Sequence, residues 1–494
     1  MLHHDDKSWA QRLVGTARLG DKRRNERAAQ VALGFLANPG VSLAAAARGS
    51  EAAKERYYRH VRSASVCADE LLKSACLATA ADVVQDARGD VLLIADTTTL
   101  GYTHAVAKEL GHTGRVENNA VRGWQVHTVL AVSADSGEIF GPVEQLWWSR
   151  NPDQYGHAKQ RQKRPYEFKE SYKWESGAQS ACERLAAMDD RIVLVTDRES
   201  DVYEYLVHLV GQAQRFIIRC SWNRCVEGGV EHVFERLEAR PVLAELQLEI
   251  AQKGGRSRRV AHLRLRTESM VLKPPHDVVS QQPPIMVNAV LLEEYSAPQG
   301  AEPVRWILFT SDPVEGVADA MKVARRYAKR WRIEEFHKVW KSEGMRVEHL
   351  RMATADNLRR AAVLQAFCAA RLMRLRDALV PHRETLTRKQ QDHNGDVNAE
   401  QEVQVKALAN APCDQILTTT QWKLLWTASE KTSPPQNIPS RRWASLALAR
   451  LGSWTDTKST GRPGYRAYFC GWQRLMERCS FYEELPLLGL QIAG

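Results

Sequence analysis

Apolar residues along the chain follow two patterns, and the first predicts a buried sheet. The runs VLLIA (91–95) and IVLVT (192–196) have the length of a strand and are rich in branched aliphatic residues, as is typical of strands covered on both faces. Two further strand-like runs lie at 126–132 and 139–148. We therefore expect an α/β core in which helices flank a mixed sheet.

Between residues 240 and 305 the pattern changes to the alternation of half-buried strands. Apolar and polar residues alternate from 243 to 250 and again from 260, and the run IMVNAVLLEE follows two prolines at 283 and 284. A period of two residues favours an all-β segment. The run RWILFT, which contains Trp306, closes this segment.

Helical periodicity characterises the first 66 residues. The tripeptide Asn-Pro-Gly at 38–40 interrupts one helix, and Ser42 is placed to cap the next. A further helix over 70–84 leads into the first strand of the core. We therefore place the boundary of an N-terminal helical domain near residue 70, so that this domain covers residues 1–70.

The last part of the chain is also predicted to be helical. Residues 358–379 form a long amphipathic pattern, and apolar residues recur at helical spacing over 443–488. Polar stretches and a pair of prolines separate these segments. The patterns divide the rest of the chain into an α/β core over 71–385 and a C-terminal helical domain over 386–494.

The net charge narrows the class of binding partner. The 494 residues carry a formal charge of +10 and a sequence pI of about 9.1, which favour a polyanion over an acidic small molecule. Residues 1–66 contain twelve Lys and Arg against six Asp and Glu, so +6 of the excess lies there. Such clustering is the usual electrostatic footprint of nucleic-acid binding, although a basic soluble surface would give the same counts.

Other classes of protein are disfavoured by features that the sequence lacks. No run approaches eighteen uninterrupted apolar residues, and the first residues, MLHHDDKSW, lack the order of a signal peptide. We therefore expect no membrane span and a cytoplasmic, nucleoid-associated protein. The nine cysteines include no CxxC pair, which disfavours a zinc site or a disulfide framework.

Arginines on two N-terminal helices could present positive charge to DNA in the manner of a compact helical reader. Arg24 and Arg27 precede the break at 38–40, and Arg59 and Arg62 follow it. A solvated amphipathic helix pair would carry the same residues, so that interpretation stays open at this point.

Two aspartates directly follow strand-like runs. Asp96 comes after 91–95 and Asp197 comes after 192–196. Each is therefore expected at the carboxyl end of a buried strand, which is the rim where ligands bind in open α/β sheets. For either aspartate alone, a strand-end cap or turn residue is the more common role.

A third carboxylate lies in the basic and aromatic stretch YAKRWRIEEFHKVWK, at 327–341. A helix advances about 100° per residue, so one helix through this stretch would place four side chains on a narrow face. These side chains are Tyr327, Arg330, Glu334 and Lys341. Lys338 would lie beside this face, and His337 would be a helix-surface residue. The alternative is a solvated, salt-bridged surface helix.

The three acids together suggest a metal site. Asp96, Asp197 and Glu334 would supply the oxygen ligands that Mg²⁺ or Mn²⁺ prefers. Two such ions, placed beside a nucleic-acid phosphate, clamp the attacking and leaving oxygens of an in-line displacement at phosphorus. The neighbouring cations would then bind phosphates.

The chain resembles the bacterial insertion-sequence DDE transposases that carry a Tyr-x2-Arg-x3-Glu-x6-Lys signature, in particular those that excise a transposon through a DNA hairpin. The resemblance extends along the chain, through LGDKRRNER, DTTTL, RGWQVHT, LWWSR, TDRESDVYEYL, YAKRWRIEEFHKVWK and RWASLALARLGSWTDTK. It implies a ribonuclease H-like mixed-sheet catalytic core with a β-subdomain inserted at about 240–305. It also implies an N-terminal domain that binds transposon ends and a C-terminal domain that forms the dimer contact.

The resemblance also assigns roles to individual residues. Asp96, Asp197 and Glu334 correspond to the metal-binding catalytic triad of the family. The other signature residues, Tyr327, Arg330 and Lys341, correspond to the residues that grip phosphates around the cleavage site.

Residues outside the triad and signature are assigned in the same way. Arg24, Arg27 and Arg59 fall where the family contacts its transposon-end sequence, and Trp306 falls at the tryptophan of the family's flipped-base pocket. Arg219 and Trp331 could also line that pocket or the phosphate track, but ordinary packing would explain both equally well.

We therefore expect a Mg²⁺-dependent (or Mn²⁺-dependent) DNA transposase that uses two ions. It would bind the terminal inverted repeats of its element as double-stranded DNA, cut them free through a hairpin, and join them to target DNA as a homodimer. The alternative is a catalytically silent DNA-binding regulator of transposition. A structure-selective nuclease on the same core is a weaker alternative.

Overall fold

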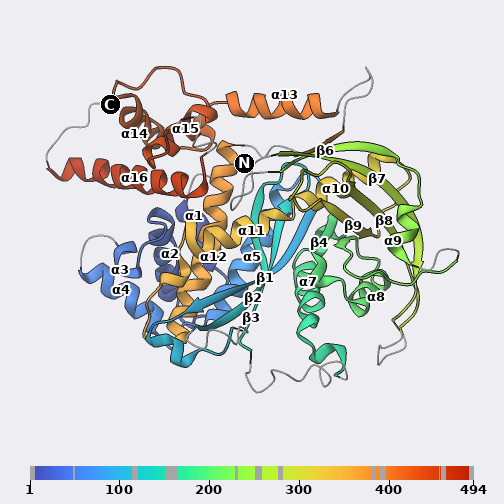
Figure 1. Ribbon diagram of the computed structural model, residues 1–494. Helices are drawn as coiled ribbons and strands as arrows, with labels where there is room; N and C mark the ends of the chain where they lie inside the picture. Colours follow the sequence, from blue (N-terminus) through green and yellow to red (C-terminus); the bar gives the residue numbers. More distant parts are fainter. Residues whose placement is uncertain are drawn as a thin grey trace.

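The described part of this computed structural model is built around one large mixed sheet (Figure 1). The structure describes residues 6–47, 51–113, 121–150, 164–228, 232–250, 259–275, 282–380, 385–388, 397–455, 457 and 463–488. All structural statements below refer to these residues.

Ten strands form the sheet within the described ranges, in the order β10-β6-β7-β8-β9-β5-β4-β1-β2-β3. The strands are β1 (Val91–Tyr102), β2 (Arg122–Ser133), β3 (Ile139–Trp148), β4 (Ile192–Thr196), β5 (Phe216–Arg219), β6 (Ala244–Ile250), β7 (Arg259–Leu272), β8 (Ile285–Glu294), β9 (Arg305–Thr310) and β10 (Leu386–Arg388). β4 lies parallel to both β1 and β5, and the other pairs are antiparallel. The mixed sheet predicted from the strand-like runs is confirmed.

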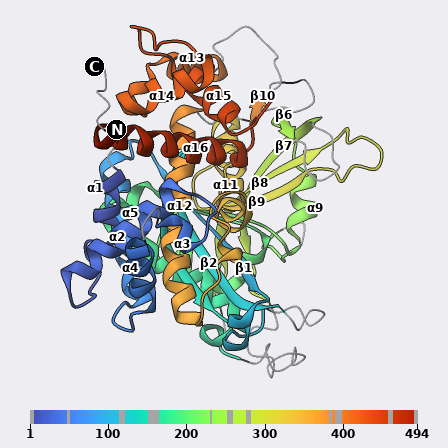
Figure 2. The ribbon, with the colours of Figure 1, turned by 90° about the vertical axis from the view of Figure 1, so that its left-hand side faces the viewer.

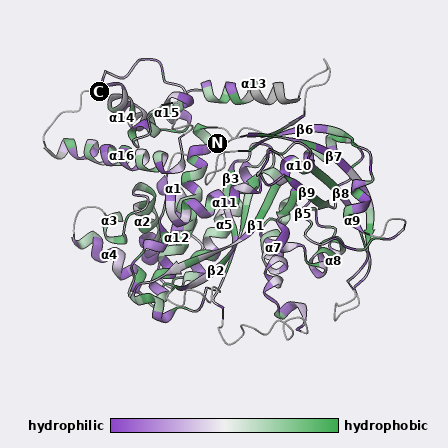
Figure 3. Ribbon diagram, in the orientation of Figure 1, coloured by the Kyte–Doolittle hydropathy of each residue, from purple (hydrophilic) through white to green (hydrophobic). Residues whose placement is uncertain are grey.

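The strands of the alternating segment extend this same sheet. β6, β7 and β8 pair in sequence, and β9 joins them to the parallel strands through β5. The burial of β6 alternates strictly, as expected for a strand with one face covered. Figure 3 shows hydrophobic residues concentrated in the central strands, whereas helices such as α16 carry both kinds of residue.

Helices cover the sheet and form both ends of the described chain. The α-helices are α1 (Asp6–Val14), α2 (Lys22–Ala37), α3 (Leu43–Ala46), α4 (Glu51–Arg62), α5 (Ala68–Asp86), α7 (Lys173–Arg184), α8 (Tyr203–Gly211), α9 (Val233–Glu238), α10 (Val317–Ala328), α11 (Trp331–Lys338), α12 (Ala355–Leu379), α13 (Val397–Asn410), α14 (Thr419–Glu430), α15 (Arg441–Leu451) and α16 (Tyr465–Glu484). The predicted helices over 70–84 and 358–379 correspond to α5 and α12.

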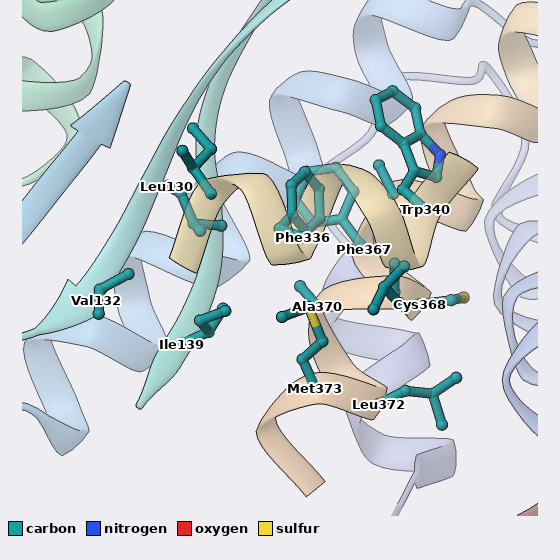
Figure 4. Close-up of a cluster of buried hydrophobic side chains, with 14 of the residues drawn as sticks. Leu130, Val132, Ile139, Phe336, Trp340, Phe367, Cys368, Ala370, Leu372 and Met373 are labelled. Atoms are coloured by element: carbon teal, nitrogen blue, oxygen red, sulfur yellow. The ribbon is translucent and has the colours of Figure 1, made fainter. Parts of the chain in front are cut away.

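The core between the sheet and α12 is apolar. α5 and α12 both contact β3. Leu130 of β2 and Ile139 of β3 face the same cluster as Phe336 of α11 and Phe367 of α12 (Figure 4). These four side chains are at most 2 % exposed, so α11 is fixed against the sheet by its apolar face.

The N-terminal helices pack on α12 rather than standing apart from the core. α2 begins after Asp21, whose carboxylate caps the helix by accepting from the amide of Arg23, and Ser42 caps α3 as the sequence predicted. Cys368 Sγ of α12 donates to Ala32 O of α2 at 3.3 Å. The side chain of Arg371 reaches Asp6 at 3.1 Å.

The C-terminal helices lie beyond the end of α12 and beside the N-terminal helices (Figure 1, Figure 2). α15 and α16 pack on each other, and α16 also contacts α2. The indole nitrogen of Trp472 donates to Leu36 O at 3.1 Å.

None of the described helices combines the length and the apolar character needed to cross a membrane. All nine cysteines are free thiols.

Candidate active site

Asp96 lies inside a strand and not at its end. β1 continues from Val91 to Tyr102 because β2 pairs with it along its whole length, and Asp96 is opposite Thr128. The parallel partner β4 ends earlier, and its pairing with β1 stops at Ile94. The predicted position of Asp96 at a strand end is therefore wrong. Asp96 instead lies just beyond the last residues of β1 that pair with β4.

Asp197 directly follows β4, as predicted. Its Oδ1 accepts from the amide of Glu199 at 2.9 Å and caps a short 3₁₀ turn, Arg198–Ser200. This turn directs the chain away from the sheet towards α8. Asp96 on β1 and Asp197 just after the neighbouring strand β4 therefore both lie close to the level at which β4 ends.

The signature stretch is not one helix, which corrects the helical-wheel prediction. Tyr327 lies in the last turn of α10, which ends at Ala328, and Glu334 lies in α11, which begins at Trp331. Lys341 lies in a π-helical turn, Val339–Glu343. π-helical turns alter the angular spacing of side chains and are frequent at functional sites.

Arg330 connects the segments of the signature. Its Nη2 donates to Glu334 Oε1 at 2.8 Å. Its guanidinium also lies 5.2 Å from the ring centroid of Trp331 and 6.0 Å from that of Tyr327. Arg330 is buried, at 8 % exposure, so the Arg330–Glu334 pair is shielded from solvent more than a surface ion pair would be.

The three acids of the predicted triad share one electrostatic environment. The pKa of Asp96 is raised to about 7, first because of burial and then because of the negative charge of Asp197, with a smaller contribution from Glu334. A hydrogen bond from the Thr97 amide and the charge of Arg330 oppose this shift. Two nearby carboxylates therefore disfavour ionisation of a third.

In this conformation the acids are near one another but do not form a finished cage. Across the described ranges, no three His, Cys, Asp or Glu side chains are grouped so that they could hold a metal ion. Glu334 is instead bonded to Arg330. The donor chemistry still fits Mg²⁺ or Mn²⁺, because these ions prefer carboxylate oxygens and a divalent cation would relieve the repulsion that raises the pKa of Asp96.

Lys341 binds to the strand that carries Asp96. Its Nζ donates to Thr99 O at 2.6 Å and lies 3.6 Å from a carboxylate oxygen of Glu348. Lys338 is more exposed and pairs with Glu343 at 2.7 Å. Both lysines follow Glu334 in the sequence. Lys341 is bonded to β1, whereas Lys338 pairs with Glu343.

An aromatic and basic group adjoins the acids. The rings of Trp306 and Tyr327 pack edge to face with centroids 5.2 Å apart. Arg219 forms a hydrogen bond with the Tyr327 hydroxyl, and its Nη2 donates to Arg305 O at 2.8 Å. Burial raises the pKa of Tyr327, so the phenol stays protonated and remains a hydrogen-bond donor near neutral pH.

Family models match two parts of the chain. Residues 6–66 match the family described as "Transposase DNA-binding", and residues 176–371 match the family described as "Transposase DDE domain". The chain therefore carries two transposase domains. Asp197 and Glu334 lie inside the DDE match, whereas Asp96 precedes it.

The transposase DNA-binding domain contains the predicted arginines on two helices. Arg24 and Arg27 lie on α2, and Arg59 and Arg62 lie on α4. Arg24 Nη1 donates to Leu19 O at 2.5 Å, so this side chain also supports the turn before α2. The more exposed Arg59 and Arg62 stay close to α4, through Glu55 at 3.9 Å and over the ring of Tyr58 at 4.8 Å.

Two histidines lie where the sequence did not suggest. His337 is buried, not at the helix surface, and burial lowers its pKa to about 3, with a further contribution from Lys341. The helical wheel was wrong here because α11 packs against β1 and α12, and His337 is buried in the folded chain. His127 is fully buried, and its Nδ1 lies 3.1 Å from Thr97 Oγ1. Its place inside the predicted strand run at 126–132, which is buried throughout, was the available signal.

Lys173 was also missed. It lies at the start of α7 at 7 % exposure and donates to Glu199 Oε1 at 2.8 Å. Its ammonium group is 5.3 Å from the ring of Trp174 and 5.7 Å from that of Trp148. In the sequence, Lys173 follows several other basic residues, and nothing in that pattern distinguishes a buried lysine from an exposed one.

Proposed function

We propose that this protein is a DDE transposase of the insertion-sequence type, with a Tyr-Arg-Glu-Lys signature, that cuts its element out through a DNA hairpin. The single observation that carries the proposal is electrostatic. Burial and then the charge of Asp197 raise the pKa of Asp96 to about 7, with a smaller contribution from Glu334, although the three residues are far apart in sequence. Three neighbouring acids would supply the carboxylate oxygens that phosphoryl transfer with divalent ions requires.

The metal-binding residues are Asp96, Asp197 and Glu334. Two Mg²⁺ or Mn²⁺ ions, when bound, would supply charge stabilisation at the attacking and leaving oxygens. Arg330 has a second role in this proposal. A DNA phosphate that accepts from its guanidinium would compete with Glu334, and the freed carboxylate could then turn towards the two aspartates.

Four phosphoryl transfers follow in the proposed sequence. Water attacks the phosphorus at the transposon end, and the 3′ oxygen of the transposon strand leaves. That 3′ hydroxyl then attacks the opposite strand and closes a hairpin, with release of the flanking DNA. A second water opens the hairpin, and the restored 3′ hydroxyl attacks a target phosphodiester. Positioning and charge stabilisation supply most of the catalysis in such transfers.

Other residues would hold the DNA. Tyr327 and Lys341 would bind phosphates around the cut, with Lys338 and Arg219 beside them, while Trp306 would receive a base flipped out by the hairpin bend, next to Trp331. The packing of Trp306 on Tyr327 and the bond between Tyr327 and Arg219 support a common role for these three residues.

The N-terminal helices would read the transposon end, through Arg24, Arg27, Arg59 and Arg62. We further propose that the core is ribonuclease H-like with β6–β8 as its inserted strands. The C-terminal residues 386–494 would form the contact of a homodimer on DNA.

The decisive experiment compares DNA binding with DNA cleavage. We expect Asp96→Asn and Glu334→Gln to retain binding to the inverted repeat that flanks the coding sequence and to lose nicking in Mg²⁺. Asp356→Asn is the matched control, since this carboxylate lies on α12 with its side chain 84 % exposed. Nicking by either triad variant at the wild-type rate would refute the assignment. A wild-type protein that shifts the repeat without cutting it would instead be a DNA-binding regulator.

A further inference from the structure

Trp222 is an exposed tryptophan on a loop that the proposed chemistry does not use. Its side chain is 65 % exposed, more than that of any other described tryptophan. It lies in the segment that follows β5, between the cysteines at 220 and 225. The exposed indole offers a flat aromatic face to a ligand.

The loop that carries Trp222 is held firmly by a buried acid. The carboxylate of Asp201 accepts from the amide of Ser221 at 2.6 Å and from that of Trp222 at 3.1 Å. Arg224 donates to the same carboxylate at 2.6 Å and 3.1 Å. The Asp201 side chain is fully buried and that of Arg224 is 7 % exposed. Because a buried ion pair adds little net stability, its main effect here is to fix the loop.

The same contacts place the loop beside the candidate active site. Asp201 follows Asp197 by four residues, on the turn that Asp197 caps. At the start of the loop, the amide of Cys220 donates to Ile307 O at 2.7 Å, next to Trp306. The preceding residue is Arg219, which is bonded to Tyr327. The loop therefore joins the segment of one catalytic aspartate to the strand of the base-pocket tryptophan.

Among the described residues of its loop, the neighbours of Trp222 do not form an apolar patch that would suit a protein partner. Ser221, Asn223 and Cys225 are exposed, and Asn223 is bonded to the carboxylate of Glu235 at 3.0 Å. Interfaces with proteins need contiguous apolar area. A single indole flanked by small polar residues suits a planar aromatic ligand instead, and DNA supplies such a ligand wherever a base leaves the stack.

We propose that Trp222 is a second stacking platform, separate from Trp306, which binds an unstacked nucleobase of the DNA at the cut. The inference rests on the proposed function, since it places a DNA end beside Asp197. The base can come from the transposon strand or from the flanking strand, and the chemistry of stacking is the same for both. Stacking on an aromatic side chain tolerates any base sequence.

The test measures stacking without cleavage. Forked duplexes that carry 2-aminopurine at the first unpaired position of one arm or the other are titrated with protein in the absence of divalent metal. Quenching of 2-aminopurine in one arm identifies the strand that stacks. We expect Trp222→Ala to weaken binding of a forked duplex about fivefold or more, with less quenching. Trp222→Phe should retain most of both signals, and a fully paired duplex should be bound equally by all variants.

Two controls make the outcome decisive. Trp222→Leu keeps apolar bulk but has no aromatic face, so we expect it to resemble Trp222→Ala. Val84→Ala removes an exposed apolar side chain from α5 and should change nothing. The inference is overturned if Trp222→Ala or Trp222→Leu binds and quenches like the wild type. A wild-type protein that binds neither the forked duplex nor the inverted repeat would overturn the proposed function instead.

Discussion

The hydroxyl of Tyr465 links the C-terminal helices to the signature helix, and its removal gives a sharp test of that connection. This oxygen accepts from Arg332 Nη1 at 3.0 Å and from Arg376 Nη1 at 3.2 Å, and it donates to Glu335 Oε2 at 3.0 Å. Arg332 and Glu335 lie on α11, beside Glu334. We predict that Tyr465→Phe loosens α16 from α11.

The expected magnitude follows from the partners of this hydroxyl. Hydrogen bonds to charged groups contribute about 1.5–3 kcal/mol each, but the three bonds share one oxygen. Both arginines also keep the buried carboxylate of Asp377 as a partner. The phenylalanine ring fills the same space, so no cavity term is added. The unfolding free energy should therefore fall by about 2 kcal/mol.

Tyr468→Phe is the matched control. Its hydroxyl lies 2.7 Å from Ser445 Oγ, which is a bond between α15 and α16 and does not reach α11. That neutral bond should contribute only about 1 kcal/mol. Urea unfolding would give both values, and hydrogen exchange would show whether α16 opens in the first variant alone.

A double-mutant cycle isolates the interaction. Combining Tyr465→Phe with Glu335→Gln should give a loss smaller than the sum of the two single losses, since both changes remove the same bond. If Tyr465→Phe costs no more than Tyr468→Phe, or if the two losses simply add, the hydroxyl does not couple these helices.

Three further predictions concern other parts of the chain. A Cβ at Gly471 would lie 1.9 Å from Leu448 O, so Gly471→Ala should force α15 and α16 apart. The urea midpoint should fall by the equivalent of about 1–3 kcal/mol. Gly464→Ala, where nothing lies within 4 Å of the added Cβ, should be nearly neutral. Burial and two nearby arginines lower the pKa of His60 to about 4, below its unfolded value of about 6.5. The unfolded chain therefore binds a proton first as the pH falls. The free energy of unfolding should decrease by about 3 kcal/mol between about pH 6.5 and about pH 4. His60→Leu should remove this loss when unfolding is compared at neutral and acidic pH. Lys341→Met should reduce the salt dependence of DNA binding. The slope of the logarithm of the binding constant against the logarithm of the salt concentration should decrease in magnitude by about 0.9. An unchanged slope would mean that Lys341 does not bind a phosphate.

Local patterns in the sequence predicted much of the fold. The strand predicted at 139–148 has the same bounds as β3, because polar residues follow the apolar run directly after Trp148. β1 was predicted to stop at Asp96, yet it continues through a row of threonines, since β2 offers those residues a full antiparallel partner. β10 has only three residues and lies in a polar stretch, so nothing local distinguishes it from a loop. It exists because β6 has an edge to pair with.

The candidate site was predicted residue by residue, but its geometry was not. Asp197 and Glu334 both contribute to the raised pKa of Asp96, but the role of the three acids as one metal site stays a prediction. The break between α10 and α11, and the π-turn at Val339–Glu343, depend on how α11 packs against the sheet and α12. A helical wheel takes no account of those tertiary contacts, so it predicted His337 at the helix surface although the residue is buried. Trp222 was missed because only the long-range bonds of Asp201 show that its loop is fixed.

The packing of both chain ends on one another has a consequence for biosynthesis. Leu36 and Trp472, 436 positions apart, meet through a hydrogen bond, and Ala32 and Cys368 meet across 336. Closing such long loops costs entropy before the contacts repay it, and such topologies mature slowly. The N-terminal helices therefore lack their final neighbours until residue 472 has been synthesised, and ribosome-bound nascent chains should resist protease in this region only after residue 472 has emerged.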